Sequence, residues 1–429
     1  YLTHADILTQ EEGVYRTLHD ACIGVRGGRI VFLGEKAPQE EGAQYRDFSG
    51  KLLIPGLVNA HCHSPMTLLR GLGSDQPLDT WLYDYMFPTE DRLRPQDIRA
   101  GSALAILEML ACGTTSFSDM YFMCDETIEA CIQAGIKANI ARPVQCFDAS
   151  ERYADNTRAK ESIALFKRWH GAQDGRIRVD FSIHAEYTCT EQVARGYCED
   201  CQKYGASLHI HLSETKKEHQ ACLARYGVTP AQWFARAGAF ASPVMAAHGI
   251  YVTAQDIELL AAHGATVMHN PTSNMKLGSG LCPVQKLLDA GVNVCLGTDG
   301  AASNNNLNML EELHLASVIH NGFACDAQVM PPRTTFAMAT QNGARMQGRP
   351  DTGALCVGKR ADIVAIDLGA PHLFPRLDDM ALLCYSVQAS DVCMTMVDGR
   401  ILYENGVYYT LDREKILHDA KESAAYLFG

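Results

Sequence analysis

Residues 52–63 read Leu-Leu-Ile-Pro-Gly-Leu-Val-Asn-Ala-His-Cys-His, an apolar run that ends in two histidines. In a β-strand the side chains of residues i and i+2 point to the same face, so the imidazoles of His61 and His63 can both reach one ion. In barrels of parallel strands, catalytic groups stand where the strands end. The segment therefore predicts a barrel strand with a metal site at its carboxyl end, and two unrelated histidines are the alternative.

The middle of the chain repeats this plan, because short apolar strands alternate with helix-like stretches over nearly 300 residues. Strands are expected at 116–119, 138–142, 178–184, 207–212, 245–248, 266–270 and 293–299, and helices at 96–111, 125–134, 159–170, 192–204 and 254–263. Repeated strand–helix units indicate a parallel α/β fold, and at this length a (β/α)₈ TIM-like barrel is favoured. A doubly wound sheet would bring a GxGxxG or phosphate-loop motif, and the sequence has neither.

The two ends of the chain differ from the middle, because their sequences predict short strands and turns. Residues 21–34 form two apolar runs around Gly27-Gly28, which predicts a hairpin, and residues 361–368 and 392–403 are also strand-like. A small β-sandwich built from both chain ends follows. We divide the chain into 1–54 (sandwich), 55–349 (barrel) and 350–429 (sandwich plus a C-terminal helix at 411–427).

Composition restricts the partners and the compartment. The chain of 429 residues has a formal net charge of −13, and an acidic surface repels nucleic acid. Its apolar runs are far shorter than the ~18 residues of a membrane span, and the N-terminus lacks the pattern of a secretory signal. Sixteen scattered cysteines, including the pair Cys198 and Cys201, are expected to be free thiols. We therefore expect a cytoplasmic protein with no membrane or nucleic-acid partner.

Further metal-competent side chains stand at other strand ends. His211 lies near the end of its strand with Glu214 three residues on, whereas His209 is expected to fill the inside of the barrel. His248 and Asp299 each end an apolar strand and precede a glycine. A lone histidine or aspartate on such a strand is more often a core residue. Closure of a barrel makes these ends converge, however, and this favours one shared site.

Three imidazoles and one carboxylate suit a single divalent metal, with Zn²⁺ favoured and Fe²⁺ or Mn²⁺ as alternatives. Such a metal lowers the pKa of bound water from ~15.7 to ~7, and Glu214 and His248 are candidates to move the proton and orient the water. The strand at 138–142 contains no lysine that could carry a bridging carbamate, so one metal is favoured over two. Motifs of zinc proteases, serine hydrolases and cytidine-type deaminases are absent from the sequence.

The ordered motifs resemble the amidohydrolase superfamily, and within it the bacterial S-adenosylhomocysteine/5′-methylthioadenosine deaminases. The resemblance runs through nearly the whole chain. Its anchors include Pro55-Gly-Leu-Val-Asn-Ala-His-Cys-His, Pro65-Met-Thr-Leu-Leu-Arg-Gly, Cys112-Gly-Thr-Thr, His211-Leu-Ser-Glu-Thr, His269-Asn-Pro-Thr-Ser-Asn-Met-Lys-Leu-Gly and Gly297-Thr-Asp-Gly-Ala-Ala-Ser-Asn-Asn.

This resemblance implies a role for each matching residue of the reaction centre. His61, His63, His211 and Asp299 would bind the metal, with Asp299 also counted among the catalytic residues. Glu214, which would contact the substrate, would carry a proton to the purine N1 and then to the leaving ammonia. His248 would polarise the water.

The resemblance also implies substrate contacts. His184 would contact the purine, Trp81 would border the nucleoside pocket and Glu90 would bind the ribose hydroxyls. Arg142 and Arg152 would bind the carboxylate of an amino-acid tail. The alternatives are a core position for Trp81, a helix-start charge cluster for Glu90, a pair with Asp119 for Arg142 and a solvated loop for Arg152.

Two other positions are left open by the sequence. His269 is expected to support the fold rather than touch substrate. Glu186 departs from the pattern of the resembling family after His184, and its carboxylate either lines the pocket or faces away from it.

The predicted activity is hydrolytic deamination of an adenine nucleoside with a 5′-thioether. S-adenosylhomocysteine would give S-inosylhomocysteine, and 5′-methylthioadenosine would give 5′-methylthioinosine, each with release of ammonia. The alternative is a hydrolase of free aminoheterocycles such as triazines or aminopurines, which would have no use for the ribose contact of Glu90. A non-catalytic scaffold would lack a metal ligand or Glu214, and none is missing. The resemblance also implies a homo-oligomer.

Overall fold

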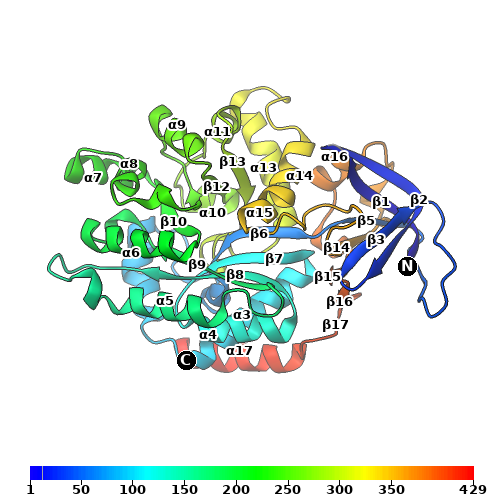
Figure 1. Ribbon diagram of the computed structural model, residues 1–429, viewed down its shortest axis with the longest axis horizontal. Helices are drawn as coiled ribbons and strands as arrows, with labels where there is room; N and C mark the ends of the chain where they lie inside the picture. Colours follow the sequence, from blue (N-terminus) through cyan, green and yellow to red (C-terminus); the bar gives the residue numbers. More distant parts are fainter. Residues whose placement is uncertain (12) are drawn as a thin grey trace.

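The computed structural model of the protein describes residues 1–11 and 13–429. Its centre is a barrel of eight parallel strands that pair in chain order, as expected from the sequence (Figure 1). The strands are β6 (Leu57–Cys62), β7 (Thr114–Met120), β8 (Lys137–Val144), β9 (Ile177–Ile183), β10 (Leu208–Leu212), β11 (Val244–His248), β12 (Thr266–His269) and β13 (Asn293–Leu296). Nearly all residues of these strands are buried, because both faces of the sheet are covered.

Polar contacts between β6 and the segment after β13 bring the first and last barrel strands together. The Asn59 side-chain amide donates to Thr298 Oγ1 at 2.7 Å, and the Thr298 amide donates to Asn59 Oδ1 at 3.0 Å. The amide of Asp299 donates to the His61 carbonyl at 2.9 Å. The ends of β6 and β13 are therefore held side by side, and this places Asp299 next to the two histidines that follow Ala60.

Helices surround the barrel. Those expected from the sequence are present within two residues of the expected limits: α3 (Pro95–Ala111), α4 (Cys124–Ala134), α5 (Thr157–Trp169), α6 (Glu191–Tyr204) and α9 (Ala254–Ala262). The sequence analysis did not identify α7 (Lys216–Tyr226), α8 (Pro230–Arg236), α10 (Pro271–Lys276), α11 (Val284–Asp289), α12 (Ala301–Asn304), α13 (Met309–Ala324), α14 (Pro332–Ala339) or α15 (Gln341–Met346). Most of these helices are short or lack a clear apolar stripe, which is the signal that sequence periodicity detects.

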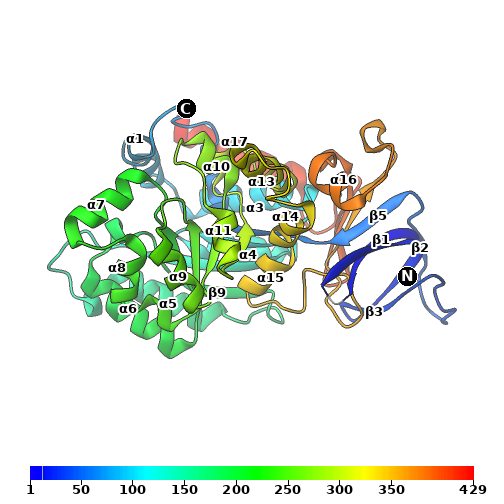
Figure 2. The same cartoon turned by 90° about the horizontal axis from the view of Figure 1, so that it is seen from above.

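A second sheet unites the two chain ends at one side of the molecule (Figure 2). Its order is β17-β16-β15-β14-β5-β1-β2-β3, and β5 pairs antiparallel with β14 so that the N- and C-terminal parts join there. The strands are β1 (Leu2–Glu11), β2 (Val14–Arg26), β3 (Arg29–Gly34), β4 (Arg46–Asp47, beside β1), β5 (Lys51–Pro55), β14 (Ile363–Asp367), β15 (Val392–Val397), β16 (Arg400–Glu404) and β17 (Val407–Tyr408). The hairpin at Gly27-Gly28 is confirmed, since Arg26 pairs with Arg29 across it.

The last helix, α17 (Arg413–Phe428), lies against α3 of the barrel (Figure 1). Its residues Ala420 and Leu427 are buried in one apolar cluster with Met66 and Trp81. The C-terminal helix therefore supports the barrel rather than the sheet that precedes it. Within the described residues, no helix is long and apolar enough to cross a membrane.

Candidate active site

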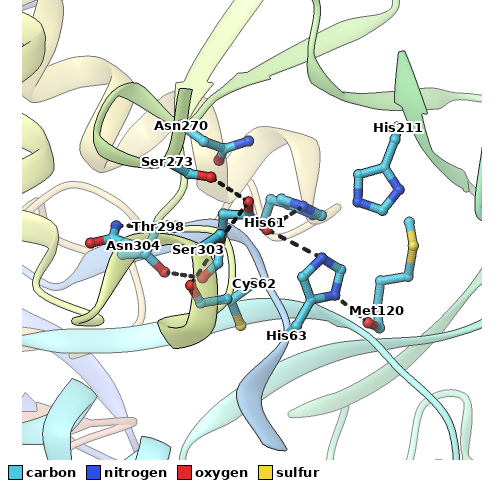
Figure 3. Close-up of polar contacts among 12 residues, drawn as sticks. His61, Cys62, His63, Met120, His211, Asn270, Ser273, Thr298, Ser303 and Asn304 are labelled. Carbon is cyan, nitrogen blue, oxygen red and sulfur yellow. Dashed lines mark hydrogen bonds and ion pairs between the residues drawn. The ribbon is translucent and has the colours of Figure 1, made fainter. Parts of the chain in front are cut away.

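The strand-end histidines and Asp299 converge as the sequence predicted. One side-chain nitrogen from each of His61, His63 and His211 lies within 4.8 Å of the other two. Donor atoms of His61, His248 and Asp299 meet the same criterion. In Figure 3 the rings of His61, His63 and His211 surround a common space. Parallel strands of a closed barrel end at the same rim, and this is why residues 238 positions apart, His61 and Asp299, become neighbours.

The three rings are held by hydrogen bonds at their other nitrogen. Nδ1 of each ring meets a buried partner: Nε2 of His209 at 2.8 Å for His61, the carbonyl of Met120 for His63, and the carbonyl of His184 at 2.8 Å for His211. Such contacts fix the ring and its tautomer, so that Nε2 faces the centre. His209 thus fills the inside of the barrel, as expected, and also holds a neighbouring ring in place.

Asp299 is oriented by two hydroxyl groups. Ser273 and Ser303 donate to its Oδ2 at 2.6 and 2.8 Å (Figure 3), which leaves Oδ1 at 3.4 Å from His61 Nε2 and 3.2 Å from His63 Nε2. Ser273 and Ser303 were not identified from the sequence. They lie in two of the motifs that carried the resemblance, two positions after Pro271 and six positions after Gly297.

The donor set fits a divalent cation. Burial lowers the pKa of His61 to about 4, which leaves the ring neutral at physiological pH. Burial also lowers the pKa of His63, but the hydrogen bond and charge of Asp299, with the Met120 carbonyl and the Asp119 charge, together outweigh burial and raise the value to about 9. Nε2 of His61 is buried and has no hydrogen-bond partner within the described structure. An orphaned imidazole nitrogen beside an ionised carboxylate is the environment that a metal ion with N and O ligands requires.

Glu214 and His248 stand together beside this centre. Glu214 Oε2 lies 3.8 Å from His248 Nε2, and His248 Nδ1 donates to Asn274 Oδ1 at 2.8 Å. Burial raises the pKa of Glu214 above its usual value. A buried carboxylate with a raised pKa can both accept and return a proton near neutral pH. The pair therefore has the chemistry of a proton-transfer site next to the metal donors.

These groups open into a cavity of about 830 Å³, within the usual size range of small-molecule sites. The cavity brings together most of the residues that the sequence analysis selected. They are His63, Trp81, Glu90, Arg142, His184, His211, Glu214, His248 and Asp299. One cavity therefore contains the candidate metal site, the candidate proton carrier and the candidate substrate contacts.

Trp81 and Glu90 both line this cavity. Trp81 is 5% exposed and packs with Met86 and Leu93, and it also lines the cavity. It is therefore both a core residue and a pocket residue, the two alternatives that the sequence left open. Glu90 lies in the cavity wall, where the Tyr121 hydroxyl donates to its Oε1 at 2.6 Å. Sequence reasoning missed Tyr121, although it lies two residues after Asp119 at the end of a predicted strand.

The two arginines predicted to contact substrate, Arg142 and Arg152, differ in position. Arg142 lines the cavity and pairs with Glu161 at 3.0 Å, and not with Asp119. Arg152 has a 72% exposed side chain, pairs with Asp155 at 2.7 Å and is not among the cavity-lining residues. The first turn of α5 instead places Arg158 in the wall, a residue that the sequence analysis did not select.

Two further side chains lie away from the cavity. Glu186 is fully buried and both of its oxygens accept from Arg225 of α7 at 3.1 Å, so it faces away from the cavity. His269 is buried against His320, with 3.1 Å between their Nε2 atoms, and does not line the cavity. All sixteen cysteines are free, including Cys198 and Cys201 in α6.

A model of the amidohydrolase family matches residues 52–402. The chain belongs to that family. A 5-methylthioadenosine/S-adenosylhomocysteine deaminase of Pelotomaculum thermopropionicum is 40% identical over 428 residues, which cover 99% of this chain and 97% of that protein. A 5′-deoxyadenosine deaminase of Methanosarcina acetivorans is 40% identical over 411 residues, 96% and 94% of the two chains. The resemblance seen in the sequence is thereby confirmed.

Solved structures agree with this fold. An adenosine deaminase of Xanthomonas campestris with bound zinc has a TM-score of 0.91 and 30% identity, covering 99% of this chain and 98% of that one. The atrazine chlorohydrolase of Arthrobacter aurescens, complexed with zinc, also has a TM-score of 0.91 but 24% identity, with 99% of each chain covered. The second likeness concerns the fold alone. The barrel with a sheet built from both chain ends is thus the family architecture.

Proposed function

We propose that the protein is a metal-dependent deaminase of adenine nucleosides that carry a 5′-thioether, with S-adenosylhomocysteine and 5′-methylthioadenosine as substrates. Water replaces the amino group at purine C6, and ammonia leaves. The observation that carries the proposal is the presence of Glu90 in the same cavity as Glu214 and the imidazole and carboxylate cluster. The two deaminases described above, each about 40% identical to this chain, support the choice of nucleoside.

The site would hold one divalent metal through His61, His63, His211 and Asp299. Zn²⁺ is proposed, with Fe²⁺ and Mn²⁺ as alternatives, and the zinc-containing adenosine deaminase structure supports this choice. When bound, such a metal supplies an acidified water at neutral pH. Metal analysis of the purified protein, followed by chelation and reconstitution with each ion, tests the identity of the metal.

The protein's own side chains would move the protons. Glu214 takes a proton from the attacking water and delivers it to purine N1, and a second transfer lets ammonia leave from C6. His248, fixed by Asn274, accepts a hydrogen bond from the water and orients it. The raised pKa of Glu214 suits a group that has to both accept and donate in one cycle.

The remaining cavity residues would bind the nucleoside. His184 contacts the purine, Trp81 covers the pocket and Glu90, held by Tyr121, accepts hydrogen bonds from the ribose. Arg142 binds a tail carboxylate. We extend this role to Arg158, because it lines the same cavity, and we retain Arg152 as a prediction to be tested against it.

Ammonia release and loss of adenine absorbance on a substrate panel test the proposal. The panel contains S-adenosylhomocysteine, methylthioadenosine, 5′-deoxyadenosine, adenosine, guanine and an aminotriazine. We expect turnover of the 5′-thioether nucleosides, and a fall in kcat of about 10²–10⁴-fold in Glu214→Gln. Turnover of free heterocycles alone would replace this proposal by the alternative hydrolase.

Arginine variants separate the tail contacts. We expect Arg142→Ala and Arg158→Ala to lower kcat/KM for S-adenosylhomocysteine by about tenfold or more, the effect of losing one charged contact, and to spare methylthioadenosine. Arg152→Ala tests the third arginine in the same assay. Equal losses of kcat/KM for both substrates would show that these arginines do not bind the carboxylate of the amino-acid tail.

We also propose that the enzyme acts in the cytoplasm as a homo-oligomer. The sixteen free cysteines support a reducing compartment. Sedimentation of the purified protein measures its oligomeric state. Fractionation of the source cells tests its location.

A further inference from the structure

The carboxylate of Glu218, in the first turn of α7, is ringed by backbone amides of the loop that carries Glu214. The amide of Ser213 donates to Oε1 at 3.0 Å, and the amides of Glu214 and Thr215 donate to Oε2 at 2.6 and 3.3 Å. Three successive N–H groups that converge on one anion form a nest. We propose that Glu218 is a positioning residue that fixes Glu214 and His248 for proton transfer, an inference that rests on the function proposed above.

The backbone at this loop needs such support. Ser213 has φ +46°, in the left-handed region that non-glycine residues rarely adopt. A conformation of this kind is strained and persists where surrounding contacts determine it. The Glu218 carboxylate supplies these contacts directly, since it binds the amides of Ser213 and of the two residues after it. The direction in which the Glu214 side chain leaves the backbone therefore depends on Glu218.

The peptide group between Ser213 and Glu214 also contacts the loop that follows His248. The carbonyl oxygen of Ser213 accepts from the amides of Ile250 and Tyr251 at 3.2 and 3.0 Å. These residues lie two and three positions after His248, which itself has φ +71°. One peptide group thus links the loop of the proton carrier with the loop of the histidine that faces it at 3.8 Å. A shift of Ser213 would change both positions together.

Comparable helix starts show what Glu218 adds. Each of α8 and α9 begins with a threonine whose backbone amide is bound by the side chain three residues on: Thr229 by Gln232 at 3.2 Å, and Thr253 by Asp256 at 2.9 Å. Glu218 makes that contact with Thr215 and also binds the two amides before it. Ordinary helix capping accounts for the first contact. The other two contacts belong to the loop of the proton carrier.

Glu218→Ala and Glu218→Gln, with Gln232→Ala as the matched helix-cap control, test this role in the metal-loaded enzyme. We expect kcat to fall by about 100-fold in Glu218→Ala, the effect of a displaced catalytic group, while KM changes little. Glu218→Gln keeps one carbonyl acceptor, so the expected fall is about tenfold. The acidic limb of the kcat–pH profile should also move in both variants, because it depends on the surroundings of Glu214. Gln232→Ala should leave kcat and the profile unchanged.

Formate provides a second readout, because it can bind the amides that Glu218→Ala leaves open. We expect added formate to restore part of kcat in Glu218→Ala and to have no effect on the wild type. Unchanged kcat in both Glu218 variants would overturn the inference. Loss of kcat that only follows loss of bound metal or a lowered Tm would also overturn it and leave Glu218 a structural role; if Glu218→Ala does not fold, Glu218→Gln decides. Absence of any nucleoside turnover by the wild type would instead reject the proposed function.

Discussion

Hydrogen bonds from neighbouring side chains orient the individual residues of this site. His61 faces the centre because His209 binds its other nitrogen, and Asp299 presents Oδ1 because two serine hydroxyls occupy Oδ2. Glu90 is held in the same way by Tyr121. In each case the holding side chain is buried or nearly so, and the chemistry requires fixed geometry more than it requires a particular partner.

Glu186 gives a prediction at this scale, since its carboxyl group is buried and paired with Arg225. Burial raises its pKa from 4.5 to about 7 despite that arginine. Between these pH values the folded protein binds more protons at Glu186 than the unfolded chain does. The free energy of unfolding should therefore fall as pH rises through this window, by up to about 1.4 kcal/mol per pH unit from this group.

Glu186→Gln removes this titration, so its stability relative to the wild type should increase from pH 4.5 to pH 7 and then level off. Urea unfolding at a series of pH values measures the difference. A difference that is constant across the window would show that Glu186 ionises alike in the folded and unfolded chain. Because Glu186 faces away from the cavity, kcat at neutral pH should not change.

Sequence patterns predicted the strands and helices better than they predicted individual residues of the site. Apolar strands with polar ends predicted the barrel strands and placed His61, His63, His211, His248 and Asp299 at one rim. The same patterns did not identify Tyr121, Arg158 or Glu218. These residues lie beyond the end of a strand, in a loop or in the helix after it. Whether their side chains face the site depends on the path of the loop, which local periodicity does not encode.

The close packing of the ends of β13 and β6 gives a prediction about metal binding. A Cβ atom at Gly297, directly after β13, would lie 2.7 Å from the His61 amide nitrogen and 2.6 Å from Asn270 Oδ1. Gly297→Ala should push the end of β6 outward and displace His61. We expect metal affinity to fall by about 10–100-fold, the usual effect of disturbing the support of a ligand, as measured by titration of the metal-free protein.

Gly322→Ala in α13 is the control, because a Cβ there would have no neighbour within 4 Å. It should bind metal as the wild type does and be slightly more stable, since alanine favours a helix. Equal metal affinity in the two variants would mean that the β6–β13 contact does not position His61.

A charge cluster at the amino end of the barrel, in which Lys137 and Asp362 are buried, joins the barrel to the sheet of the chain ends. Nζ of Lys137, the first residue of β8, lies 2.5 Å from Asp362 and 2.7 Å from Asp398. Asp362 directly precedes β14 and Asp398 directly follows β15 of the sheet of the chain ends. This contact crosses between the barrel and the C-terminal part of the chain. The division at 1–54, 55–349 and 350–429, which we continue to propose, therefore separates units that are tied together by charge.

Lys137→Met should destabilise the whole molecule, because it leaves the buried carboxylate of Asp362 without its ammonium partner, whereas the partly buried Asp398 keeps Arg360 at 3.2 Å. The expected loss is about 3–5 kcal/mol in the free energy of unfolding, as found when one partner of a buried pair is removed. Lys203→Met is the matched control, since Lys203 forms an exposed pair with Asp200 at 3.5 Å and should cost less than about 1 kcal/mol. Urea unfolding measures both, and kcat of the folded Lys137 variant should match the wild type, because the cluster lies at the opposite end of β8 from Arg142 and the cavity. A loss no larger than that of the control would show that the barrel and the sheet of the chain ends are held by apolar packing instead.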